Sequence, residues 1–229
     1  MGPRSRHASR APCLSLSSFL NPMREIITLD VGGDANRSYC LVDEPGREAW
    51  CVDPSYGAPQ ILALLAARGL RLTEIFLTHT HPDHVATLPE LQRATGARTW
   101  IHPLEKARVP AATALPGEGK LGQVPGTEVI FTPGHTPGGT CYRIGEALFT
   151  GDVLFVDWVG RSDFPGGDAR ALFQSLAKLR TLPPGLIIHP GHHYGSVETR
   201  TLGEEARVNK FFGCKDYVRF LNLLPELSE

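Results

Sequence analysis

Three of the nine histidines stand within six residues, at His79, His81 and His84, with Asp83 between the last two. In an extended loop, alternate side chains face the same way, so His79 and His81 can bind one metal ion. Pro82 bends the chain, which lets Asp83 and His84 face a second ion. Imidazole and carboxylate ligands suit zinc, iron or manganese. The spacing therefore predicts a metal centre.

Three further candidate ligands are each preceded by a glycine and an apolar run. They are His135, Asp152 and His192. Loops at the carboxyl ends of strands are where open α/β sheets place their ligands, and glycine lets the backbone turn sharply there. Together with the histidine cluster, these residues complete a site.

The elements that must position these residues occur in two similar halves. The first half is predicted to contain strands at 25–29, 38–42, 49–52, 74–77 and 99–101, and helices at 59–68 and 88–95. Residues 78–84 are predicted to be a loop, and 102–126 a long Pro/Gly-rich connection. The second half is predicted to contain strands at 127–131, 140–144, 147–149 and 186–188, and helices at about 168–182, 197–211 and 215–224. This order predicts an α/β fold in which two sheets pack face to face with helices outside.

Composition bounds the class of protein. The chain has 229 residues, 41% hydrophobic and 21% charged, which fits one domain with a sizeable core. Its net charge of −1 argues against a nucleic-acid partner, which would need a basic face. No apolar run is long enough to span a bilayer, so we expect no membrane partner. The five cysteines form no C-x-x-C pair, which favours reduced thiols in a cytoplasmic protein.

The first 22 residues differ from the rest, because they are rich in Arg and Ser and contain no acidic residue. We interpret 1–22 as a disordered leader or gene-model extension, with Met23 as an alternative start, and 23–229 as a single domain. Organelle targeting by this leader is the second interpretation.

The ordered motifs resemble those of the metallo-β-lactamase-fold superfamily. They are the segments 78–84 (THTHPDH), 133–136 (PGHT), 151–152 (GD) and 191–192 (GH), within a match over about 25 to 212. The resemblance implies a four-layer αββα sandwich of two mixed β-sheets flanked by helices. It also implies two divalent metal ions, zinc before iron or manganese. The first would be bound by His79, His81 and His135, the second by Asp83, His84 and His192, and both by Asp152.

Within that superfamily, the chain looks most like the glyoxalase II and persulfide dioxygenase branch. The segments that carry this resemblance are 151–155 (GDVLF), 160–164 (GRSDF) and 192–194 (HHY). True β-lactamases of this fold commonly have Cys at the place of Asp152, which disfavours antibiotic hydrolysis. The resemblance implies that Arg161 and Tyr194 contact the glutathione part of a substrate.

The resemblance leaves several functions open. The first is a thioesterase of the glyoxalase II type, in which a metal-bridged hydroxide attacks an acyl-thiol and Asp83 and Asp152 are catalytic. The alternative is a persulfide dioxygenase with one Fe(II) on His79, His135 and Asp152. Lactonases and phosphodiesterases of the same fold, and a non-catalytic metal-stabilised binding module, rank below these.

The expected partner is a small-molecule thioester or persulfide, glutathione-linked in the resembled enzymes, and the expected assembly is a monomer or homodimer. His102 is predicted to be structural, and the resemblance assigns no role to His189 or His193.

Overall fold

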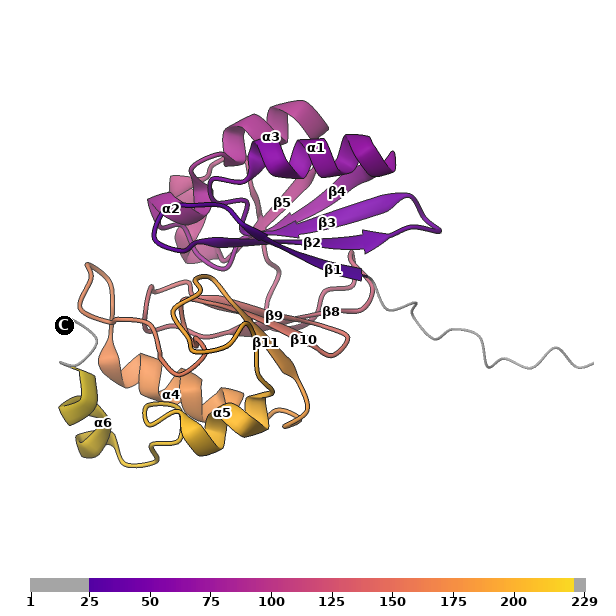
Figure 1. The fold of residues 1–229 in the computed structure, drawn as a ribbon. Coiled ribbons are helices and arrows are strands. Elements are labelled where there is room, and N and C mark those ends of the chain that lie inside the picture. Colours follow the sequence, from indigo (N-terminus) through magenta and orange to yellow (C-terminus); the bar gives the residue numbers. More distant parts are fainter. Residues whose placement is uncertain (1–24, 225–229) are drawn as a thin grey trace, which may run out of the picture.

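Two β-sheets face each other across an apolar core (Figure 1). The computed structural model describes residues 25–224, so the predicted leader at 1–22 lies outside the described residues. The first sheet contains β1 (Glu25–Asp30), β2 (Arg37–Asp43), β3 (Glu48–Val52), β4 (Arg71–Phe76), β5 (Arg98–Ile101) and β6 (Thr113–Ala114), in that order. The second has the order β11 (Ile187–Pro190), β10 (Ala147–Gly151), β9 (Thr140–Ile144), β8 (Thr127–Phe131) and β7 (Gly119–Lys120).

Helices cover the outer face of each sheet. On the first sheet lie α1 (Ala58–Arg68) and α3 (Leu88–Thr95), and on the second α4 (Ala169–Leu179), α5 (Leu202–Val208) and α6 (Tyr217–Leu223) (Figure 1). Separate apolar clusters join each sheet to its helices. Both sheets mix parallel and antiparallel pairs. These layers confirm the αββα sandwich.

Strand β2 shows why the central residues of a middle strand are apolar on both faces. Its side chains alternate between the two faces of the sheet, so Cys40 and Val42 pack on the helix side and Tyr39 and Leu41 pack between the sheets. All four are buried. A strand covered on both faces has no polar face, which explains the continuous apolar run.

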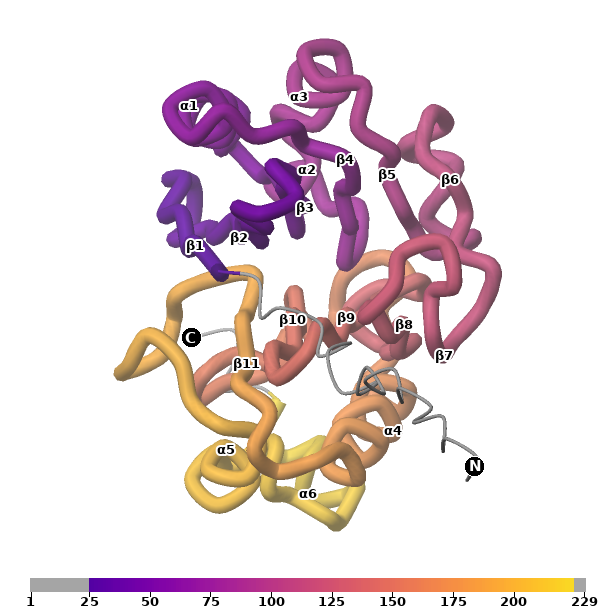
Figure 2. The backbone as a smooth tube through the Cα atoms, turned by 90° about the vertical axis from the view of Figure 1, so that its right-hand side faces the viewer, coloured from indigo at the N-terminus to yellow at the C-terminus, as the bar shows by residue number. Residues whose placement is uncertain are grey.

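The two halves of the chain occupy different layers (Figure 2). Strand β6 is an edge strand of the first sheet and β7 is an edge strand of the second, so the connection between them leads the chain from one layer to the other. The 102–126 segment was predicted without regular structure, but it contains both short strands and a 3-10 turn, η1 (Pro103–Arg108).

Several predicted boundaries differ from the structure, and two of the differences have a clear physical cause. Residues 78–84 are not all loop, because α2 (Pro82–Val85) begins within them. Proline ends a strand, but its fixed φ suits the first position of a helix. The predicted helix at 197–211 is shorter, because Thr201 caps α5 with a capping box. The residues before it are held extended, since the Ile188 N–H donates to the Arg200 carbonyl.

The described cysteines are Cys40, Cys51, Cys141 and Cys214, and all four are free and buried. This agrees with the expectation of reduced thiols; Cys13 lies outside the described residues. Within 25–224, no helix combines the length and the apolar character needed to cross a membrane.

One inter-sheet hydrogen bond offers a test of how the layers are held. The fully buried Tyr142 donates from its hydroxyl to the Leu77 carbonyl, just before the histidine cluster (2.8 Å). Tyr142→Phe leaves that carbonyl without this donor and should lower the free energy of unfolding by about 1–3 kcal/mol. Urea denaturation measures the difference. The control is Tyr217→Phe, whose ring is half-buried and packs on Phe173, and a loss no larger than the control's would contradict the prediction.

Candidate metal centre

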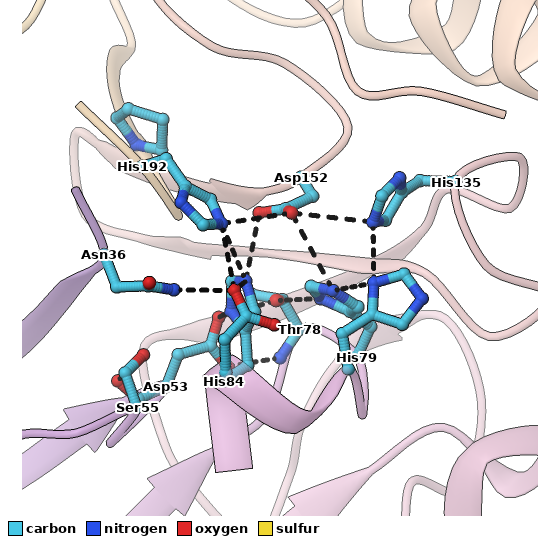
Figure 3. Close-up of polar contacts among 12 residues, drawn as sticks. Asn36, Asp53, Ser55, Thr78, His79, His84, His135, Asp152 and His192 are labelled. Atoms are coloured by element: carbon cyan, nitrogen blue, oxygen red, sulfur yellow. Dashed lines mark hydrogen bonds and ion pairs between the residues drawn. The ribbon is translucent and has the colours of Figure 1, made fainter. Parts of the chain in front are cut away.

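The seven residues predicted to bind metal come together at the carboxyl ends of strands from both sheets. Figure 3 shows five of them, His79, His84, His135, Asp152 and His192. All seven are carried by the segment after β4, the β8–β9 loop, and the ends of β10 and β11. The structure arranges them in two groups, and within each group the ligand atoms lie within 4.8 Å of one another. The first group is His79, His81, His135 and Asp152; the second is Asp83, His84 and His192.

Asp152 lies between the two groups. Its Oδ2 atom is 3.9 Å from His79 Nε2, 3.5 Å from His135 Nε2 and 3.3 Å from His192 Nε2, and its Oδ1 atom is 3.2 Å from His84 Nε2. The bend before His192 requires glycine, because a Cβ on Gly191 would stand 2.3 Å from Asp152 Oδ1. The carboxylate of Asp152 therefore lies within 4 Å of histidines from both groups.

The nitrogen and oxygen atoms of the first group are better suited to binding a cation than to hydrogen bonding with one another. His81 Nδ1 faces both His79 Nε2 (3.0 Å) and His135 Nε2 (2.9 Å), and the two pairs cannot both share a single proton. Asp152 Oδ1 is buried and accepts no well-formed hydrogen bond. A divalent ion satisfies such converging lone pairs, so the residues present fit the predicted metals.

The buried carboxylate of Asp53, at the end of β3, orients a histidine from each group. His84 Nδ1 donates to Asp53 Oδ2 (3.0 Å), and the Thr78 hydroxyl donates to the same oxygen (2.6 Å). Since that hydroxyl has no second proton, it accepts from His79 Nδ1 (3.0 Å). Both imidazoles therefore turn Nε2 toward the centre, as carboxylate partners of metal-binding histidines do.

The electrostatics differ between the two groups. Burial lowers the pKa of His79 well below its usual range and that of His81 to about 4, so both are neutral at pH 7. Burial also opposes the charge of His84 and His192, but carboxylates outweigh it. Asp152 and Asp53 raise the pKa of His84, and Asp152 and Asp83 raise that of His192 to about 10. Their Nε2 atoms are 3.2 Å apart, within hydrogen-bond distance, and the raised pKa values favour a proton on this pair.

A cavity of about 450 Å³ opens over both groups. Its apolar wall includes Phe155, Trp158 and Phe164. The structure places both predicted substrate-binding residues in it, each already engaged: Arg161 forms a two-point ion pair with Asp163, and the Tyr194 hydroxyl donates to Asp34 (2.6 Å).

The other histidines in question lie outside the two groups. His102 Nδ1 accepts the Leu104 N–H at the start of η1, which agrees with a structural role. His189 packs against Tyr39 and Phe149 between the sheets. His193 Nε2 lies 3.8 Å from Glu198. Of the neighbours 189, 192 and 193, His192 alone belongs to a candidate metal group among the described residues.

Two contributors were not predicted from the sequence. Asp53 follows an apolar strand, as Asp152 does, so the same strand-end rule could have found it. Asn36 donates from its side-chain amide to Asp83 Oδ2 (2.8 Å) across 47 positions of sequence, and no local pattern signals that contact.

Comparison with known proteins identifies the family. The family model for the metallo-beta-lactamase superfamily matches residues 33–192. The chain belongs to this superfamily. A hydroxyacylglutathione hydrolase from Cereibacter sphaeroides is 38% identical over 180 residues, which are 77% of this chain and 69% of the relative.

Two solved structures share the fold of this superfamily member. ETHE1 from Myxococcus xanthus has a TM-score of 0.78 and 30% identity, covering 90% of this chain and 92% of the other. TTHA1623, in a di-iron-bound form, has a TM-score of 0.69 and 35% identity, covering 81% and 99%. The named relatives thus include a hydrolase and a protein that holds two metal ions.

The different charges of the two groups predict different pH dependences of metal binding. An ion at Asp83, His84 and His192 must displace the proton that the raised pKa values retain, whereas His79 and His81 are already neutral. From pH 8 to 6, affinity at the second group should fall by about tenfold per pH unit for one displaced proton, with a smaller change at the first. Chelator competition with Zn²⁺ measures both constants. Equal pH slopes for the two would contradict this assignment.

Proposed function

We propose that the protein is a metal-dependent thioester hydrolase of the glyoxalase II type, acting on a hydroxyacylglutathione-like substrate. The observation that carries this proposal is the pair of ligand groups that line one cavity, with Asp152 of the first group 3.2–3.3 Å from two histidines of the second. The relationship to a hydroxyacylglutathione hydrolase supports the thioester as the bond that is cleaved.

The proposed cofactors are two divalent ions, with zinc as the first choice because histidine and carboxylate ligands suit it. His79, His81 and His135 would hold one ion, Asp83, His84 and His192 the other, and Asp152 both. Two ions at such a site lower the pKa of water toward neutrality and stabilise negative charge on a carbonyl oxygen.

The protein's own residues orient the reactants. Asn36 engages Asp83 Oδ2, and we assign to Oδ1 the acceptance of a proton from the attacking water. Arg161 uses Nε and Nη2 for Asp163, which leaves Nη1 to bind a carboxylate of the thiol carrier. The thiol leaves as a thiolate without a strong acid, because its pKa is about 8.5.

The second candidate is a persulfide dioxygenase with one Fe(II) on His79, His135 and Asp152. The specific observation for it is the similarity to ETHE1. The complete second group at Asp83, His84 and His192 favours the two-metal hydrolase. Oxygen uptake with glutathione persulfide, without thioester hydrolysis, would reverse this order.

The free buried cysteines support a cytoplasmic location. As part of the proposal, the protein acts there on a small molecule as a monomer or homodimer.

Replacing the carboxylate of Asp83 or that of Asp152 should remove the activity. Asp83→Ala or Asp152→Ala should lower kcat/KM for S-lactoylglutathione by about 100-fold or more, since even changes to outer partners of metal ligands cost 10–100-fold. Glu90→Ala, at an exposed acid on α3, is the matched control. Near-wild-type rates in either folded variant would refute the proposed function.

A further inference from the structure

The turn between β1 and β2, residues 31–36, contacts the second ligand group, from which it is separated by 47 or more positions of sequence. The Asn36 side chain at its end is fully buried, and Nδ2 donates to Asp83 Oδ2 (2.8 Å; Figure 3). Asp83 Oδ2 is also the atom that faces His192 Nε2 (3.4 Å) and His84 Nε2 (3.7 Å). The amide therefore acts on the oxygen that would bind the second metal.

The orientation of this amide follows from its other contact. Asn36 Oδ1 accepts the backbone N–H of Asp34 (3.1 Å). The reversed amide would place NH2 against that N–H and a carbonyl oxygen against the Asp83 carboxylate, so both contacts would be repulsive. Nδ2 is therefore the donor to Asp83. Because the donor is neutral, it fixes the carboxylate without competing with a metal for its charge.

The same turn also fixes His192. Its Nδ1 donates to the Asp34 carbonyl (2.7 Å), which leaves Nε2 for the centre. Backbone hydrogen bonds tie the two segments together on both sides, from Arg37 N–H to the Gly191 carbonyl (2.8 Å) and from His193 N–H to the Ala35 carbonyl (2.9 Å). Two of the three ligands in the second group thus depend on one turn.

The first group has different partners. His79 Nδ1 donates to Thr78, and His135 Nδ1 donates to the Arg161 carbonyl (2.7 Å). Among the hydrogen bonds of the described residues, none joins the 31–36 turn to His79, His81 or His135. A change in the turn should therefore act on one group and spare the other.

We propose that Asn36 is a positioning residue that sets the occupancy of the second metal position, so that the chain holds two ions rather than one. The inference rests on the metal centre of the proposed function. Its test measures binding alone and does not depend on which reaction the centre catalyses.

The test uses Asn36→Leu, which keeps the side-chain size and removes both polar contacts, and Asn36→Ser as a smaller change should the first fail to fold. Gln92→Leu is the matched control, because this amide on α3 bonds to Thr99 outside either ligand group. Asp53→Ala serves as a comparator, since Asp53 orients a histidine of each group. Circular dichroism confirms folding, and chelator competition with Zn²⁺ gives both binding constants.

In the Asn36 variants, one of the two association constants should fall by about 10–100-fold, as for other outer partners of metal ligands, and the other should stay within about twofold. In Asp53→Ala both should fall, and in Gln92→Leu neither. If both Zn²⁺ binding constants of a folded Asn36 variant are unchanged, or if both fall together, this inference is overturned while the proposed function stands. A wild-type chain that binds fewer than two ions would overturn both it and the proposed two-metal centre.

Discussion

The arrangement of this centre depends on the carboxylate of Asp53, buried where the first sheet ends. It accepts hydrogen bonds from the Thr78 N–H, the Thr78 hydroxyl and His84 Nδ1. The Thr78 hydroxyl in turn accepts from His79 Nδ1 and so fixes the orientation of that imidazole. One acid thereby fixes the imidazole orientation of a ligand in each group. A buried carboxylate costs free energy unless it accepts such hydrogen bonds, so the same donors that stabilise Asp53 are held in the orientation that metal binding needs.

The two sheets supply complementary parts. The first provides the histidine-rich segment and its supporting acid, while the second provides His135, Asp152 and His192 from three strand ends. Neither half of the chain holds a complete group. Each group combines side chains from α2 or the segment before it with side chains from the second sheet, such as Asp152 and His192. Apolar packing between the sheets, around Phe76, Tyr142 and Phe149, therefore supports the chemistry as well as the fold.

The sequence predicted the layers and the seven candidate ligands, because apolar runs and the polar residues that follow them are local signals. It also predicted α3 at its observed bounds. It misplaced α2 and α5, where a proline at a helix start and a capping box decide the boundary. Asp53 could have been found by the strand-end rule. Asn36 could not, because its importance comes from a tertiary contact with Asp83 that no periodicity or spacing records.

The most direct test of the account is to titrate the metal-free chain with Zn²⁺ and follow thioester hydrolysis at each equivalent added. The account predicts that the rate rises until about two ions are bound per chain and is constant beyond, since both groups contribute to one reaction. Full activity at one equivalent would contradict the shared two-metal centre. So would a chain that is active only with a single iron and consumes oxygen.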